Sequence, residues 1–96
     1  MITWDNPIKI KFKNNSSQQL AVYWIDYQGE PVFYSNVKAG GVYDMNSYVT
    51  HPWAIYTSDG QIQLIEVVSE KVPNNTQFVF DLSEQSGRIY AEISKK

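Results

Sequence analysis

Apolar and polar side chains alternate along much of the chain with a period of two residues. Residues 8–13 alternate isoleucine or phenylalanine with lysine, and residues 88–93 alternate arginine, tyrosine or glutamate with isoleucine or alanine. Successive side chains of a β-strand point to opposite faces of its sheet, so this period is typical of a strand with one buried and one solvated face. The pattern therefore predicts a half-buried strand near each end of the chain.

Turn-forming residues divide the sequence between these two strands into short extended segments. Asparagine, aspartate, glycine, proline and serine gather in the stretches 14–17, 28–31, 38–41, 59–60, 73–76 and 86–87. The segments between them are rich in β-branched and aromatic residues and recur about every ten residues, which is typical of a sandwich or barrel. We predict one all-β domain over residues 1–96, an antiparallel β-sandwich of about seven or eight short strands. The one weak candidate for a helical turn is the stretch 81–86.

Composition excludes several classes of site. The 96 residues are 43% hydrophobic, contain no cysteine and one histidine, and carry a net charge of −2. The core must form by apolar packing alone, and one histidine with scattered carboxylates makes no metal site, so we expect no metal and no other cofactor. The absence of clustered basic residues argues against a nucleic-acid partner. No apolar run reaches the ~20 residues that span a bilayer, and no signal for a compartment is present.

The densest chemistry lies between Ser47 and Trp53, where a hydroxyl, a phenol, the sole histidine and an indole follow one another closely. Ser47 and His51, with Asp26 or Asp44, have the residue types of a nucleophile, a base and an orienting acid. The sequence around Ser47 has no Gly-x-Ser-x-Gly turn, which such a nucleophile uses in the α/β-hydrolase fold. We therefore expect no catalytic residues and no enzymatic activity.

Residue types and spacing alone favour a structural role for the residues from Ser47 to Trp53 and for Trp24. Trp24 and Trp53 would then be core side chains, and His51 would be a hydrogen-bonded loop histidine. Aromatic residues are enriched in strands whether or not a ligand is bound. A recognition pocket with aromatic walls and two neutral polar groups is the alternative.

A pattern that extends over more of the chain favours the recognition pocket instead. More than a dozen residues agree in order and spacing with the β-domain of the von Hippel–Lindau tumour suppressor family, which the chain resembles over about residues 10–57. They are Phe12-x-Asn14-x-Ser16, Val22-x-Trp24, Tyr27-x-Gly29-Glu30-Pro31, Tyr34, Gly40 and Ser47-Tyr48-x-x-His51-x-Trp53. Beyond residue 60 only the strand pattern is shared.

The resemblance implies a β-sandwich that binds a peptide containing 4-hydroxyproline. Trp24 and Trp53 would line the pocket around the pyrrolidine ring, and Tyr34 and Tyr48 would hold the peptide backbone or close the pocket wall. Ser47 and His51 would hydrogen-bond the 4-hydroxyl. A serine hydroxyl and a neutral imidazole can each donate or accept, which suits a ligand hydroxyl.

The chain departs from the family in two respects. Asn46 stands where the human member has a histidine that contacts the flanks of the peptide, so Asn46 is a candidate flank contact and the flank preference is open. Full-length members continue into a helical domain that recruits elongin and a cullin ubiquitin ligase, and no helical region follows here. Recruitment of elongin and cullin is therefore not supported, and we expect a stand-alone or excised binding module.

The resulting hypothesis is a non-catalytic module that binds a prolyl or 4-hydroxyprolyl peptide or protein. Two alternatives stay open. One is a structural or accessory sandwich domain of a larger protein, in which the same residues only pack. The other is a carbohydrate-binding module, because exposed tryptophans also stack on sugars and sugar hydroxyls would suit Ser47 and His51.

Overall fold

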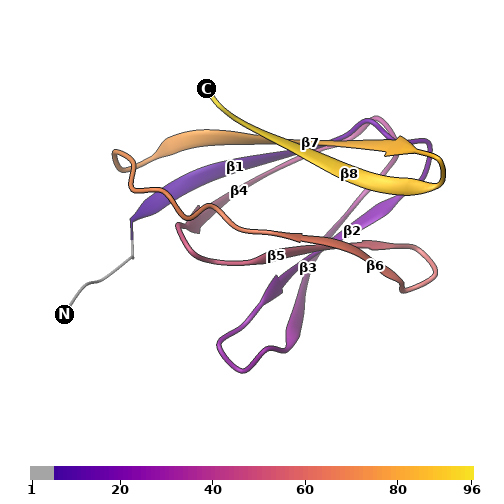
Figure 1. Ribbon diagram of the computed structural model, residues 1–96, viewed down its shortest axis with the longest axis horizontal. Helices are drawn as coiled ribbons and strands as arrows, with labels where there is room; N and C mark the ends of the chain where they lie inside the picture. Colours follow the sequence, from indigo (N-terminus) through magenta and orange to yellow (C-terminus); the bar gives the residue numbers. More distant parts are fainter. Residues whose placement is uncertain (1–5) are drawn as a thin grey trace.

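The chain forms eight β-strands and, within the residues that the structure describes, no helix (Figure 1). The structure is a computed structural model that describes residues 6–96. In chain order the strands are β1 (Pro7–Asn14), β2 (Leu20–Ile25), β3 (Pro31–Val37), β4 (Val42–Tyr48), β5 (Trp53–Thr57), β6 (Ile62–Glu66), β7 (Thr76–Gln85) and β8 (Arg88–Lys95). The predicted all-β class and the number of strands are confirmed.

The strands form two four-stranded sheets that pack face to face. The first has the order β4-β1-β7-β8 and the second has the order β3-β2-β5-β6. Figure 1 shows the first sheet above the second. The predicted sandwich is therefore present, with β3, β4, β6 and β8 as the edge strands.

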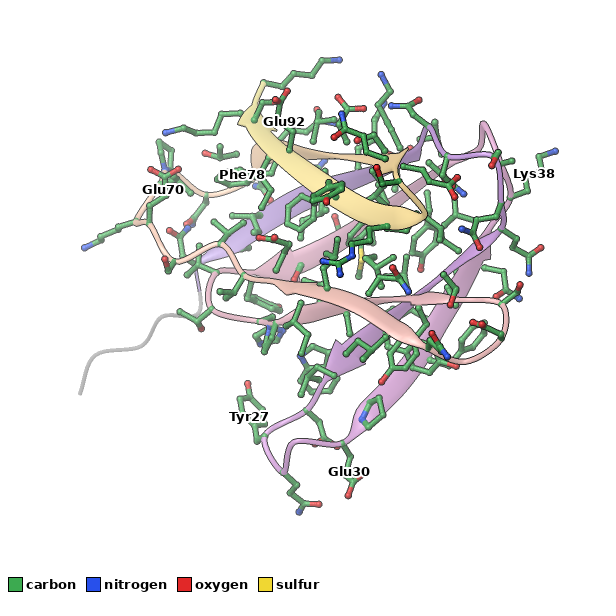
Figure 2. The ribbon with its side chains drawn as sticks, turned by 45° about the vertical axis from the view of Figure 1, so that its right-hand side comes forward. Tyr27, Glu30, Lys38, Glu70, Phe78 and Glu92 are labelled. Atoms are coloured by element: carbon green, nitrogen blue, oxygen red, sulfur yellow. The ribbon has the colours of Figure 1, made fainter. Side chains whose placement is uncertain are left out.

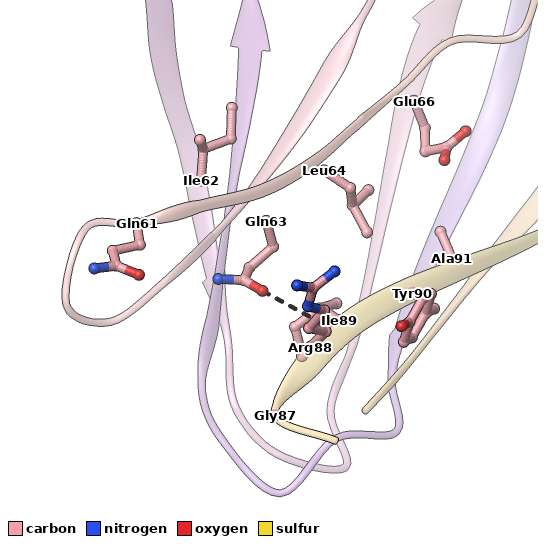
Figure 3. Close-up of a pocket in the computed structure, with 10 residues that line it drawn as sticks. All are labelled: Gln61, Ile62, Gln63, Leu64, Glu66, Gly87, Arg88, Ile89, Tyr90 and Ala91. Atoms are coloured by element: carbon pink, nitrogen blue, oxygen red, sulfur yellow. Dashed lines mark hydrogen bonds between the residues drawn. The ribbon is translucent and has the colours of Figure 1, made fainter. Parts of the chain in front are cut away.

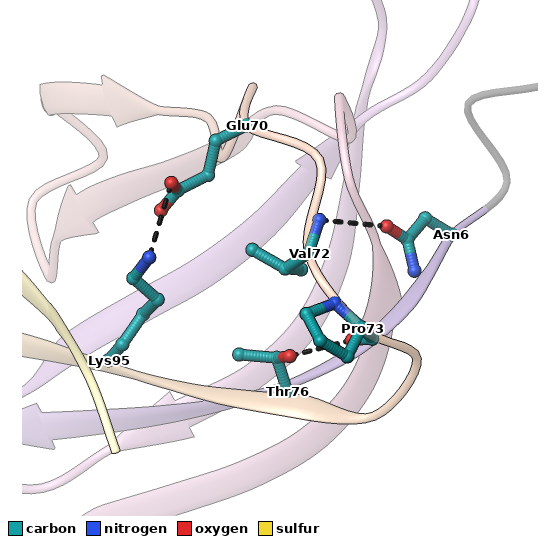
Figure 4. A network of polar contacts seen from close by, with 6 residues as sticks. All are labelled: Asn6, Glu70, Val72, Pro73, Thr76 and Lys95. Carbon is teal, nitrogen blue, oxygen red and sulfur yellow. Dashed lines mark hydrogen bonds and ion pairs between the residues drawn. The ribbon is translucent and has the colours of Figure 1, made fainter.

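The description of the sandwich as antiparallel is wrong for one pair of strands. β7 runs parallel to β1, from Ile8 opposite Thr76 to Asn14 opposite Leu82. The physical reason is the long connection between β6 and β7, which returns to the end of the sandwich where β1 begins (Figure 1). Asn75 N there donates to Pro7 O (2.7 Å), and Val72 N donates to Asn6 Oδ1 (3.2 Å; Figure 4). These bonds fix the point at which β7 enters the sheet.

The weak helical candidate at residues 81–86 is also wrong. Strand β7 continues to Gln85, and its backbone pairs with β1 on one side and with β8 on the other. Leu82 is fully buried between the sheets, whereas Ser83 is exposed. Pairing on both sides satisfies the backbone groups that one isolated helical turn would leave unpaired.

The core lies between the inner faces of the two sheets. The alternating residues Ile8, Ile10 and Phe12 of β1 are at most 1% exposed. Phe12 packs edge-on against Phe80, with ring centroids 5.0 Å apart. The lysines between them take the opposite face, as their alternation predicts.

A fully buried asparagine, Asn14, closes one end of the sandwich. Its side-chain Nδ2 donates to the carbonyl oxygens of Gln18 (2.8 Å), Val37 (2.8 Å) and Lys38 (3.2 Å). Its Oδ1 accepts hydrogen bonds from Ser16 N (3.0 Å) and Ser16 Oγ (2.6 Å). One side chain thus joins the turn after β1 to the end of β3.

Two hydrogen-bonded carboxylates, those of Glu84 and Asp59, give the fold a predictable response to acid. Hydrogen bonds from the Ser17 side chain and then from its backbone hold the pKa of Glu84 below its ordinary value of 4.5. Bonds from Thr57 and Gln61 likewise lower the pKa of Asp59 below 3.8. A lowered carboxyl pKa stabilises the folded state above the unfolded value and stops doing so as the pH falls through the folded value.

We therefore expect the melting temperature to fall as the pH is lowered below about 4.5, and to fall less steeply in Glu84→Gln. Thermal unfolding between pH 3 and pH 7 measures this slope. Glu92→Gln is the matched control, since Glu92 is an exposed glutamate on β8 that accepts no hydrogen bond among the described residues. Identical slopes for wild type and Glu84→Gln would contradict the assignment.

Candidate functional site

Two tryptophans face each other across neighbouring strands at one end of the second sheet. Trp24 of β2 lies directly opposite Trp53 of β5 in the antiparallel register. Directly opposed residues share one face of a sheet, so both indoles project toward the interior. Trp53 is only 2% exposed, whereas Trp24 is half-buried and packs against the edge of the core.

The Trp53 indole joins the two sheets. Its Nε1 donates a hydrogen bond to Ser47 Oγ on β4, at 3.1 Å, and Ser47 is 4% exposed. Ser47 Oγ in turn donates a long hydrogen bond, of 3.4 Å, to Tyr48 O. A hydroxyl can donate once and accept twice, so Ser47 keeps one acceptor position beyond the bond from Trp53.

Tyr34 covers the outer edge of Trp53. The register between β2 and β3 shifts by one residue, with Tyr23 opposite Phe33 and Val22 opposite Ser35, so Tyr34 is the extra residue of a β-bulge. Bulges re-aim side chains. Here the Tyr34 ring meets the Trp53 ring edge-on, with centroids 4.9 Å apart, while 43% of Tyr34 stays exposed.

The loop between β4 and β5 places His51 on Trp24. The two rings are stacked, with centroids 5.3 Å apart and planes inclined by 27°. The Tyr48 ring also packs against the imidazole, with centroids 5.4 Å apart. The preceding residue, Thr50, has a φ of 70°, which is rare for a β-branched residue, and its N donates to Val68 O at 2.7 Å. Strained backbone of this kind often accompanies a functional loop.

Tyr27 is a member of this cluster that sequence reasoning did not name as a site residue. Its hydroxyl lies 3.3 Å from His51 Nε2, and its ring meets those of His51 and Trp24 edge-on at 6.0 and 5.8 Å. Figure 2 shows Tyr27 and Glu30 at the tip of the β2–β3 hairpin. Its one sequence signal was its place at the start of the Tyr27-x-Gly29-Glu30-Pro31 run.

The six predicted site residues therefore lie in two adjoining groups. Buried Trp53 and Ser47 form one group with the partly exposed Tyr34, and Trp24, His51 and Tyr48 form the other. The Trp24–Trp53 pair joins them. We call the six residues together with Tyr27 the aromatic cluster.

The candidate flank residue Asn46 lies outside the aromatic cluster. It is exposed on β4 opposite Lys9, on the sheet face that Ser47 does not share. There it lines a shallow hollow of about 460 Å³ together with Lys9, Lys11 and Asp44.

A larger hollow, of about 590 Å³, lies between the edge strands β6 and β8 (Figure 3). None of the predicted site residues lines it. Its walls include Gln61, Glu66 and Arg88, and Gln63 Oε1 accepts a 3.4 Å hydrogen bond from Ile89 N. Size alone thus does not mark the candidate site, whose chemistry lies in the aromatic cluster.

One polar atom of the aromatic cluster is buried without a partner. Trp24 Nε1 has no hydrogen-bond acceptor among the described residues. A buried donor in a native structure is normally bonded, so an unbonded one calls for an explanation.

Residues 6–96 hold neither a metal-ligand cluster nor a membrane-spanning helix. No group of three or more histidine, cysteine, aspartate or glutamate side chains there could hold a metal ion. No helix in this range is long and apolar enough to cross a membrane.

Comparison with known proteins agrees with the resemblance in the sequence. The family model described as VHL beta domain matches residues 3–77 of the 96-residue chain. No curated protein matches the chain. The matched range contains strands β1 to β6 and every residue of the aromatic cluster. Because the match covers well over half of the sequence, the chain belongs to the VHL beta domain family.

Proposed function

We propose that this protein-binding β domain is non-catalytic and recognises a prolyl or 4-hydroxyprolyl peptide through the aromatic cluster. Membership of the VHL beta domain family supports binding of a peptide or protein partner. The observation that carries the finer proposal is that Ser47 and His51 each lie against one of two tryptophans that face each other across β2 and β5.

The aromatic rings suit a proline side chain. A pyrrolidine ring is compact, rigid and apolar, so burying it against an indole costs little conformational entropy. Trp24 and Tyr48 present partly exposed rings next to His51, and Tyr34 presents one against Trp53. In this proposal Trp53 forms the floor and the other rings form the walls.

Ser47 and His51 would distinguish hydroxylated from unmodified proline. The 4-hydroxyl would donate a hydrogen bond to the acceptor position that Ser47 keeps. It would form a second hydrogen bond with the imidazole of His51. Ser47 and His51 already bond Trp53 and Tyr27, so an unmodified proline would only forgo the additional hydrogen bonds of the hydroxyl, each worth about 0.5–1.5 kcal/mol.

A purely structural role is the second candidate, and one observation favours it. Ser47 is 4% exposed and already accepts a hydrogen bond from Trp53. In that case the cluster would close the end of the sandwich and bind nothing. Binding measurements distinguish the two candidates.

The test is isothermal titration with two alanine-based peptides that differ only in 4-hydroxylation of one central proline. We expect the hydroxylated peptide to bind about tenfold more tightly, since its hydroxyl would gain two hydrogen bonds worth about 0.5–1.5 kcal/mol each. Ser47→Ala should reduce this ratio. Equal affinities for the two peptides would contradict the proposal that the site recognises the hydroxyl. Binding of neither peptide would favour the structural role. A glycan screen with the same protein tests the carbohydrate alternative.

A further inference from the structure

Tyr27 lies over His51 although it contributes nothing to the core. It is 86% exposed, so its removal opens no internal cavity. Its hydroxyl nevertheless lies 3.3 Å from His51 Nε2, and its ring stands almost perpendicular to the imidazole, at 88°. Such an exposed tyrosine is not needed for packing, so packing does not explain its contact with His51.

The turn that carries Tyr27 is closed by its own hydrogen bonds. Asp26 Oδ1 accepts from the backbone N of Gln28 (2.9 Å) and of Glu30 (2.8 Å). Asp26 N donates to Glu30 O at 2.9 Å, and Gly29 takes a φ of 81°, which a residue with a side chain rarely adopts. Because the turn fixes the backbone on both sides of Tyr27, its ring is held toward His51.

A hydrogen bond to one ring nitrogen of a histidine decides which nitrogen carries the proton. A phenol hydroxyl is a strong donor, and a neutral imidazole offers one nitrogen that accepts. With Tyr27 donating to Nε2, the proton of neutral His51 is on Nδ1. The same bond, together with stacking on Trp24, opposes a flip of the ring.

We propose that Tyr27 is a positioning residue whose hydroxyl fixes the tautomer and the ring orientation with which His51 meets a ligand hydroxyl. The role in ligand selection depends on the proposed function, whereas the effect on the tautomer does not. Tyr27 would then determine specificity without being a main source of affinity.

The first test needs no ligand. His51 is the only histidine in the chain, so its two ring ¹⁵N signals can be assigned without ambiguity. At pH 8, wild type should show Nδ1 protonated, and Tyr27→Phe should show a mixture of the two tautomers. Tyr90→Phe, a change to a half-exposed tyrosine on β8, should leave the signals as in wild type. Protonated Nε2 in wild type, or unchanged signals in Tyr27→Phe, would overturn the proposal.

The second test measures selectivity. Tyr27→Phe should lower the affinity for the hydroxylated alanine-based peptide about three- to tenfold more than the affinity for the unmodified peptide, a difference that corresponds to one hydrogen bond. An equal loss for both peptides would show a merely structural role and overturn the proposal. If wild type binds neither peptide, the proposed function fails and the selectivity role fails with it, while the ¹⁵N result still decides the tautomer.

Discussion

Replacing Trp53 with alanine is expected to lower the free energy of unfolding by about 3–5 kcal/mol, the usual range for a large buried aromatic residue. Trp53 is 2% exposed, packs edge-on against Phe12 at 6.1 Å, and supplies the hydrogen bond that joins Ser47 to the opposite sheet. Its loss would leave a cavity and a serine hydroxyl without its donor. Chemical denaturation followed by tyrosine fluorescence measures the change.

Trp24→Ala is the matched control for this change. Trp24 faces Trp53 in the register, but it is only half-buried and its Nε1 has no partner among the described residues. We expect it to cost clearly less stability than Trp53→Ala, and to weaken peptide binding by at least about 30-fold, as interface tryptophans often do. Equal losses of stability would contradict the division of the two indoles into floor and wall.

Replacing Asn14 with alanine is expected to lower the free energy of unfolding by about 3 kcal/mol or more, because several buried groups lose their partner at once. The side chain bonds three backbone carbonyls, including those of Val37 and Lys38, and both the backbone and the hydroxyl of Ser16. Alanine can replace none of these bonds. Urea denaturation measures the loss.

The neighbouring Asn15 provides the control for Asn14. It is exposed, and its side chain makes one hydrogen bond, from Nδ2 to Asp81 Oδ1 at 2.6 Å. Asn15→Ala should change the free energy of unfolding by about 0.5 kcal/mol or less, as is usual at exposed positions. Similar losses for the two variants would mean that the bonds of Asn14 contribute little to stability.

Local patterns predicted the strands because the residues of a strand alternate between its buried and its solvated face. The alternation of Ile8, Ile10 and Phe12 with lysines identified β1 and its inner face without any knowledge of its neighbours. The parallel pairing of β1 with β7 could not be predicted in this way. It depends on contacts between residues near 6 and residues near 75, which are far apart in the sequence.

The candidate site was likewise predictable only where it depends on neighbouring residues in the sequence. The spacing from Ser47 to Trp53 was visible because it lies within one loop and its flanking strands. The bond between Ser47 and Trp53 depends on how the two sheets face each other, and the bulge at Tyr34 depends on the register of β2 and β3. Tyr27 was missed because only the closed turn at Asp26 brings it over His51.

The central claim is that the aromatic cluster is where a hydroxylated proline binds, and an NMR titration tests it most directly. The hydroxylated alanine-based peptide is added to ¹⁵N-labelled protein, and the indole N–H signals, the His51 ring signals and the backbone amides are followed. We expect the signals of Trp24, His51 and the loop after β4 to shift, and to shift further than with the unmodified peptide. Shifts confined to the hollow between β6 and β8, or equal shifts from both peptides, would contradict it.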